Sequence, residues 1–327
     1  MSACWGVCMS AASIACGGAS STSDAAAPAN EPALYRGALT DYVPAAGLRW
    51  LVTGSPRRLA REPGLVSLRQ RWLTEERRRA FAVETGVDLF ATERALVAGF
   101  DLGTLYMADA SGWRARPEVA FARRLAGSER LRQPHPRLWH VTGLVGSEPE
   151  ALVRVADDLV AVAVEDLTLA RVVEMRALGR LERVATAFHG VSLSELPAPL
   201  LEPSAFAFYL PGPIDGEWMG ASAAGLLGAA HAFGATLEPE GTGVTLHLCV
   251  AGSWRANDDE ARLRAEWEAF AASTLGRRLA LDRPLRPTVV RGSERLLELD
   301  SALDAAAFSA GLEGLLVGNL DDLVTGR

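Results

Sequence analysis

A twelve-residue segment occurs twice in this chain, 141 residues apart and without a gap. Residues 104–115 read TLYMADASGWRA and residues 245–256 read TLHLCVAGSWRA, so six of the twelve positions are identical. Tryptophan is rare, which makes the shared Trp-Arg-Ala informative, and a repeat of this length indicates related structural units. The repeat predicts two similar units, residues 35–195 and 205–327, joined by the proline-rich linker 196–204.

The hydrophobic pattern gives the two units a similar order of elements. In the first unit, alternating apolar residues predict strands at 48–53, 95–100, 104–108, 138–145, 151–156 and 159–164. Helices are predicted between the first strand and Gly86, at 117–126 with a proline in the first turn, and at 167–188.

In the second unit, strands are predicted at 205–210, 235–238, 244–250, 288–291 and 296–300. Helices are predicted at 217–233 and 302–317, and a third helix begins with Asn257 as its N-cap. The uncharged run 219–237 has the length of a membrane span, but its many Ala and Gly residues favour a packed core helix. Each unit then reads β-α-ββ-α-ββ(β)-α. Since hairpins dominate, we expect an α+β fold with mainly antiparallel sheets and with helices on one face.

The basic residues are unusual, because all 33 are arginine and none is lysine. Schiff-base catalysis, a pyridoxal-phosphate anchor and a P-loop all need the lysine amine, so these classes are excluded. The net charge of −7 gives no counterion release on nucleic acid, and we expect no nucleic-acid partner.

The first 34 residues have a composition unlike the rest of the chain. Residues 1–16 are small or apolar and uncharged, and the following stretch is rich in Gly, Ala, Ser and Pro. Such a stretch cannot bury enough apolar surface to offset its ordering entropy, so residues 17–34 are predicted to be a disordered tether.

The segment Ser13-Ile14-Ala15-Cys16 resembles the lipobox of bacterial lipoprotein signal peptides. The resemblance implies that residues 1–16 direct export, that cleavage occurs before Cys16, and that Cys16 carries the lipid. The mature chain would then be attached to a membrane surface facing the periplasm or the exterior. The body itself resembles only uncharacterised exported lipoproteins. Cys249 would be its only cysteine, and the alternating run around it predicts a buried or half-buried strand residue.

The repeated Trp-Arg pairs, Trp113/Arg114 and Trp254/Arg255, are the candidate ligand-binding residues. An aromatic ring beside a guanidinium could hold an anionic or sugar-like ligand. The simpler interpretation, which we favour, is a tryptophan that packs a helix against a hairpin beside a solvated arginine. The five histidines lack zinc-motif spacing and no Gly-x-Ser-x-Gly occurs, so no catalytic residue, metal or cofactor is predicted.

These observations favour a lipid-anchored cell-envelope protein that binds or scaffolds an unknown protein or small-molecule ligand without catalysis. One alternative is an exported hydrolase whose site is assembled from scattered Asp, Glu, Ser or His between the two units. Another is a cytosolic protein with a disordered N-terminal tail.

Overall fold

The computed structural model describes residues 33–61, 66, 70, 74–88, 90–110, 113, 116–181, 183–189, 192–214 and 229–317. The described residues from Leu34 onward form one compact unit. Cys16 and the predicted signal peptide lie outside the described residues, as do Arg114 and nearly all of the predicted tether.

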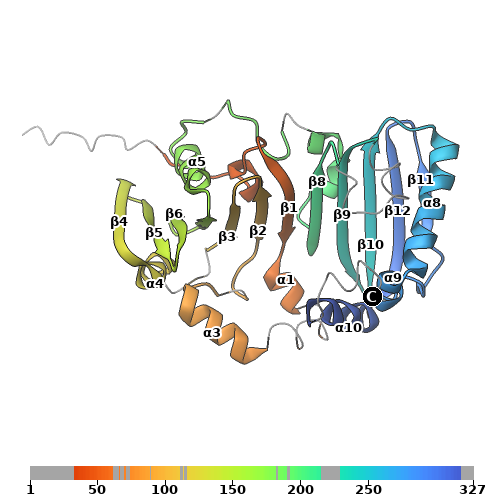
Figure 1. Ribbon diagram of the computed structural model, residues 1–327, viewed down its shortest axis with the longest axis horizontal. Coiled ribbons are helices and arrows are strands. Elements are labelled where there is room, and N and C mark those ends of the chain that lie inside the picture. Colours follow the sequence, from red (N-terminus) through yellow and green to blue (C-terminus); the bar gives the residue numbers. More distant parts are fainter. Residues whose placement is uncertain are drawn as a thin grey trace, which may run out of the picture. The chain divides into compact units, whose positions relative to one another are not determined.

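Twelve strands form a single antiparallel sheet in the described part of the chain (Figure 1). Their order across the sheet is β11-β12-β10-β9-β8-β1-β2-β3-β7-β6-β5-β4. The strands are β1 (Leu48–Gly54), β2 (Ala95–Phe100), β3 (Thr104–Asp109), β4 (Ala126–His135), β5 (Leu138–Val145), β6 (Glu148–Val155), β7 (Leu159–Val164), β8 (Phe206–Pro211), β9 (Ala230–Glu240), β10 (Gly243–Gly252), β11 (Val289–Gly292) and β12 (Leu296–Asp304).

Helices pack on both faces of this sheet, so the expectation of helices on one face is wrong. They are η1 (Leu39–Tyr42), α1 (Pro56–Arg61), α3 (Glu75–Thr85), α4 (Pro117–Arg124), α5 (Leu167–Ala177), η3 (Ser192–Glu195), α6 (Ala198–Leu201), α8 (Ala256–Ala272), α9 (Thr274–Arg278) and α10 (Ala305–Val317). The mixed α+β class and the mainly antiparallel sheet predicted from sequence are therefore confirmed.

The face that we call the first face carries the main core. On it, Tyr209, Leu51 and Ala98 are cross-strand partners in β8, β1 and β2. They are buried together with residues of η1, α5, η3 and α6, in one cluster that draws on every strand of the sheet order from β10 to β5. Leu196 and Leu200 of the proline-rich stretch belong to this cluster. Burial of this continuous apolar row is the main force that holds the middle of the sheet together.

The second face holds two separate clusters, one towards each end of the sheet. Near β10 and β12, the buried Leu263 and Trp267 of α8 pack over Val250 and Leu297. Near β5 to β7, α4 packs through Phe121. Helices thus cover this face in two places.

The two halves of the sheet, on either side of the central β1–β8 pair, have their strands in the same relative order. From β1 the sheet continues through β2, β3 and β7, and from β8 through β9, β10 and β12. The two copies of the sequence repeat begin in β3 and β10, which occupy matching places in this order. The hairpin β4–β5 interrupts the match, because nothing between α9 and β11 corresponds to it in the described chain.

Two predicted helices are wrong in part. The helix expected at 167–188 ends at Ala177, and Gly179 follows with a positive φ of 69° that few other residues adopt easily. Residues 215–228, which include most of the helix expected at 217–233, lie outside the described residues. Ala230–Glu240 is strand β9, not core helix, because Ala230, Ala232 and Gly234 alternate into the buried side.

Other boundaries also differ from the sequence prediction. Asn257 lies inside α8, whose N-cap is Arg255, and the Arg255 backbone N–H donates to Asp259 at 2.7 Å. Residues 302–304 extend β12, so α10 begins only at Ala305. Strand β4 was not predicted. Cys249 is fully buried in β10, as predicted, and its burial raises the pKa of the thiol to about 12. None of the described helices is both long and apolar enough to cross a membrane.

Candidate anion-binding site

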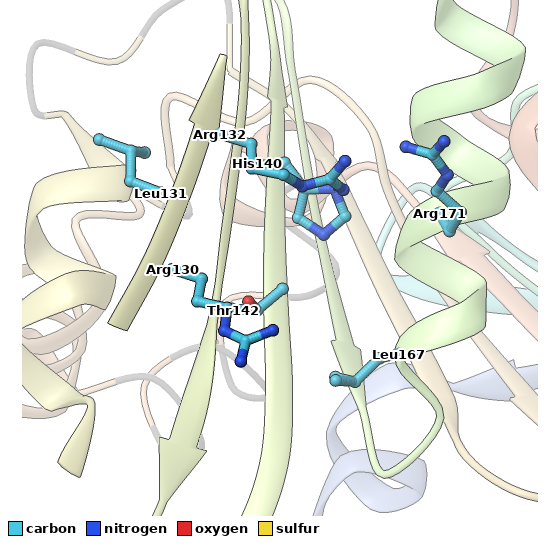
Figure 2. Close-up of a pocket in the computed structure, with 7 residues that line it drawn as sticks. All are labelled: Arg130, Leu131, Arg132, His140, Thr142, Leu167 and Arg171. Carbon is cyan, nitrogen blue, oxygen red and sulfur yellow. The ribbon is translucent and has the colours of Figure 1, made fainter. Parts of the chain in front are cut away.

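A pocket of about 580 Å³ lies where β4 and β5 face α5 (Figure 2). Alternate residues of a strand point to the same side, and the β4–β5 register pairs Arg130 with Thr142 and Arg132 with His140. All four of these side chains therefore lie on the first face of the sheet and line the pocket. Leu131, between the two arginines, is also a lining residue, and its side chain points away from those of Arg130 and Arg132 in Figure 2.

Helix α5 supplies the opposite wall. Leu167, Arg171 and Glu174 are spaced four and three residues apart, which puts them on one side of a helix. Asp166 caps this helix by accepting the backbone N–H of Thr168 at 2.9 Å, so the first turn that carries Leu167 is held in place. Packing of α5 on β6 and β7 then directs this stripe towards β5.

Glu174 lies at the centre of the polar contacts. Its side chain is only 1% exposed. One carboxylate oxygen accepts from Arg132 Nη2 at 2.9 Å and is also in contact with His140 Nδ1, while the other accepts from Arg171 Nη1. A buried carboxylate needs such partners to remain charged, and these contacts also set the positions of both guanidinium groups.

The pocket carries an excess of positive charge. Three guanidinium groups, from Arg130, Arg132 and Arg171, line it, and Glu174 is the only carboxylate in contact with them among the described residues. Arg130 makes no ion pair within the described part of the chain. Each guanidinium has five donors in a planar fork that suits carboxylate and phosphate groups. The arrangement is therefore suited to holding an anion.

His140 is the buried polar residue on the sheet side. Burial lowers its pKa, and Arg132 and Arg171 act in the same direction, whereas the contact with Glu174 opposes them. Its Nε2 atom is buried and has no hydrogen-bond partner among the described residues. In Figure 2 this nitrogen points to the side of the pocket where Thr142 and Leu167 lie.

The repeated tryptophans lie elsewhere. Trp113 follows β3, where its Nε1 donates to Thr92 at 3.0 Å and its ring packs against the cluster under α4. Trp254 follows β10 and is 7% exposed, and its Nε1 donates to the Val250 carbonyl at 3.2 Å. Both indoles thus join a helix to a hairpin on the second face.

The structure does not bring the two repeated tryptophans together. Four strands separate β3 from β10, and the two run in opposite directions. Trp113 and Trp254 each follow the C-terminal end of their strand, so they lie at opposite ends of the sheet along the strand direction. Arg255 is exposed. With Arg114 outside the described residues, the ligand-binding interpretation of these four residues stays a prediction.

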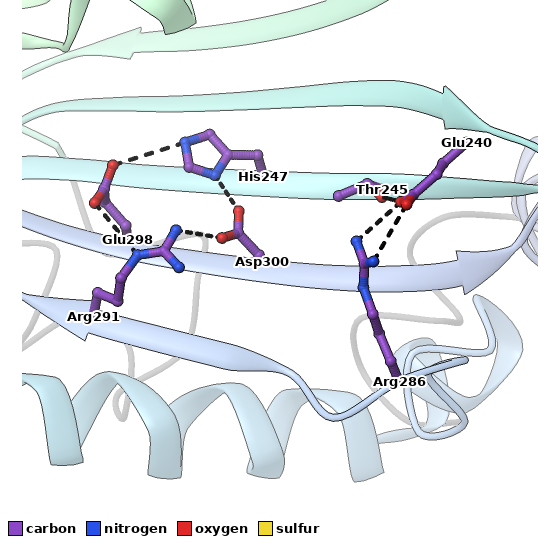
Figure 3. A network of polar contacts seen from close by, with 7 residues as sticks. All are labelled: Glu240, Thr245, His247, Arg286, Arg291, Glu298 and Asp300. Carbon is purple, nitrogen blue, oxygen red and sulfur yellow. Dashed lines mark hydrogen bonds and ion pairs between the residues drawn. The ribbon is translucent and has the colours of Figure 1, made fainter.

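A second polar network lies on the first face of β10 to β12 (Figure 3). Asp300 contacts both His247 Nδ1 and Arg291, and His247 Nε2 is 3.9 Å from Glu298. Despite partial burial, the contacts with His247 and Arg291 lower the pKa of Asp300. These groups satisfy one another, and no group of His, Cys, Asp and Glu in the described residues is arranged to hold a metal ion.

The pocket residues were not identified from the sequence. The available signal was weak: Arg-x-Arg at 130–132 and His-x-Thr at 140–142 have the two-residue period of a strand face. Without β4 in the prediction, the first pair had no assigned direction. The contact between β5 and α5 is a tertiary contact, which the spacing of residues in the sequence does not predict.

The chain was compared with protein-family models, curated proteins and solved structures. No family model matches the chain, and no curated protein matches it. Among solved structures, the chain is similar to TP0453 in crystal form III, with a TM-score of 0.49 and 13% identity over 84% of this chain and 98% of that one. Crystal forms IV and I of TP0453 give TM-scores of 0.46 and 0.44 at 11% and 10% identity, each over 84% of this chain and 96% of the other.

Proposed function

We propose that this chain is a lipid-anchored cell-envelope protein that binds an anionic ligand in the arginine-lined pocket and does not transform it. The observation that carries the binding proposal is that three guanidinium groups line one pocket and that a buried carboxylate holds two of them. Two of them, Arg132 and Arg171, are positioned by Glu174 before any ligand arrives. Such preorganisation favours binding because little side-chain entropy remains to be lost.

Binding of inorganic phosphate tests this proposal. Equilibrium dialysis of the full chain against radiolabelled phosphate at low ionic strength should show one saturable site, weakened about tenfold in Arg130→Gln, since a charged hydrogen bond contributes about 1.5 kcal/mol or more. Arg264→Gln is the matched control, because Arg264 is an exposed arginine paired with Glu260 on α8. Equal loss in both variants, or no saturable site, would contradict the proposal.

The proposed anchor is the lipid on Cys16. It is supported by the lipobox-like Ser13-Ile14-Ala15-Cys16 and by the Gly, Ala, Ser and Pro-rich stretch, with only Asp24 and Glu31 charged, that separates Cys16 from the compact unit beginning at Leu34. A tether of this kind lets a folded unit stand away from a membrane surface. The membrane is thus the proposed partner of the N-terminus, and the protein would act in the cell envelope.

Labelling with a radioactive fatty acid in the bacterial host tests the anchor. Label should follow the wild-type chain and disappear in Cys16→Ser, because no other thiol or amine takes the place of that residue. Cys8→Ser is the matched control and should keep the label. Equal labelling of the wild type and Cys16→Ser would reject the lipoprotein assignment.

We also propose that the body arose by duplication of one β-α-ββ-α-ββ-α unit. The matching strand order about the β1–β8 pair, the twelve-residue repeat and the packing of both tryptophans on the second face support this proposal. In a crystal structure, superposing residues 35–195 on 205–327 should place Trp113 on Trp254. Failure of these residues to coincide would reject the duplication.

A further inference from the structure

The proton on His140 can be assigned from its contacts. Its Nδ1 is in contact with a carboxylate oxygen of Glu174, and an ionised carboxylate only accepts hydrogen bonds. The proton of the neutral ring therefore lies on Nδ1. Arg132 Nη2, which is 2.9 Å from both atoms, donates to Glu174 and not to Nδ1. The other ring nitrogen, Nε2, is left with a lone pair.

This lone pair is an unused acceptor in a pocket whose charged lining groups, the three guanidiniums, are all donors. Nε2 is buried without a partner among the described residues, although the ring that carries it lines the pocket. A buried acceptor without a donor costs free energy, which a ligand hydroxyl could recover. Because burial lowers the pKa of His140, the ring is neutral at pH 7 to 8 and accepts at Nε2 without donating there.

The volume of the pocket also indicates the size of the ligand. Its volume of about 580 Å³ falls in the usual range for organic small molecules, and a bare inorganic anion would leave most of it empty. The three guanidiniums suit a group with several charged oxygens, and phosphate fits this better than a single carboxylate.

From this geometry we infer that the pocket binds a hydroxylated organic phosphate, with the phosphate on Arg130, Arg132 and Arg171 and a neighbouring hydroxyl donating to His140 Nε2. This inference rests on the proposed anion-binding function and adds the ligand class. The same chemistry occurs in soluble polyol phosphates and in glycerol-phosphate lipid headgroups. No covalent step is involved.

Two ligands that differ only in their hydroxyls test the inference. Isothermal titration of the full chain carrying Cys16→Ser should show glycerol 3-phosphate binding about tenfold tighter than propyl phosphate, which has the same charge and length. In His140→Asn the two ligands should bind equally, because the Asn amide can still donate to Glu174 but has no acceptor in the place of Nε2. Circular dichroism of the variant confirms that it folds.

The possible results distinguish recognition of the ligand hydroxyl from binding of the anion. If propyl phosphate binds the wild type as tightly as glycerol 3-phosphate does, the hydroxyl inference is overturned while anion binding stands. If neither binds, and inorganic phosphate does not bind either, both the inference and the proposed function are overturned. Unchanged selectivity in a folded His140→Asn would remove His140 as the acceptor and overturn the inference as well.

A vesicle-binding experiment distinguishes a lipid headgroup from a soluble phosphate as the ligand. Phosphatidylcholine vesicles containing phosphatidylglycerol should capture the same Cys16→Ser chain if the ligand is a headgroup, and glycerol 3-phosphate should then release it. Selective binding of glycerol 3-phosphate without capture by these vesicles assigns the site to a soluble phosphate. Both results support the hydroxylated-phosphate class, whereas capture that propyl phosphate reverses equally well would contradict it.

Discussion

Glu174 holds the arginine-lined pocket together at the scale of single residues. Its buried carboxylate contacts Arg132, His140 and Arg171, so removing its charge leaves two guanidiniums facing each other without compensation. Breaking a buried ion pair costs about 3–5 kcal/mol, but both arginines are about half exposed and water screens them.

We therefore expect Glu174→Gln to lower the free energy of unfolding by about 1–3 kcal/mol. Glu75→Gln should lower it by about 0.5 kcal/mol or less, because Glu75 is an exposed helix residue that pairs with Arg78 and Arg79. Urea unfolding of both variants measures the difference. Equal small losses would show that the Glu174 contacts do not hold the pocket together.

His140 makes stability depend on pH in a defined direction. The folded pKa lies below the usual 6.5, so between these two values the unfolded chain binds a proton that the folded chain does not. The free energy of unfolding therefore falls as the pH drops below about 6.5. His140→Asn should remove this part of the loss, as measured by urea unfolding at pH 7.5, 6.5 and 5.5. His231→Asn, which changes an exposed ring, is the control and should keep the wild-type dependence.

At the scale of elements, β1 is the strand on which both halves of the sheet depend, because it pairs with β2 on one side and β8 on the other. Leu51 in its middle is fully buried. Leu51→Ala should lower the free energy of unfolding by about 2–5 kcal/mol through the cavity it leaves. Leu102→Ala in the exposed β2–β3 turn, where the leucine is 75% exposed, should change it by about 0.5 kcal/mol or less. Thermal unfolding of both variants compares the two sites.

The strands that sequence predicts are those with a clear two-residue period or a hairpin turn, such as β2 and β3 around residues 101–103. The pattern predicts residues 235–238 of β9 as strand but residues 230–233 as helix, because the small residues there have high helix propensity. Pairing of β9 with β8 and β10 overrides that preference. Strand β4 contains Gly127 and Pro134, which hide its pattern. The candidate site depends on β4 and on a helix–sheet contact, so it could not be predicted even though most of the sheet was.

At the scale of the whole molecule, one sheet and one core run through both halves. The main cluster joins Leu51 and Leu96 from the first half to Tyr209 and Cys249 from the second. Such a shared core should unfold in a single cooperative step. Hydrogen exchange in increasing urea should show amides of β2 and β9 losing protection at the same concentration. Loss in one strand well before the other would indicate two independently folding halves.

An anion located in the pocket by crystallography would test the proposed binding site most directly. Crystals of the full chain carrying Cys16→Ser, grown without phosphate or sulfate and soaked in arsenate, a tetrahedral analogue of phosphate, would reveal the arsenic by its anomalous scattering. The pocket should show one strong peak within reach of Arg130, Arg132 and Arg171. A peak elsewhere on the protein, with none between β4 and α5, would contradict the assignment of this pocket as the binding site.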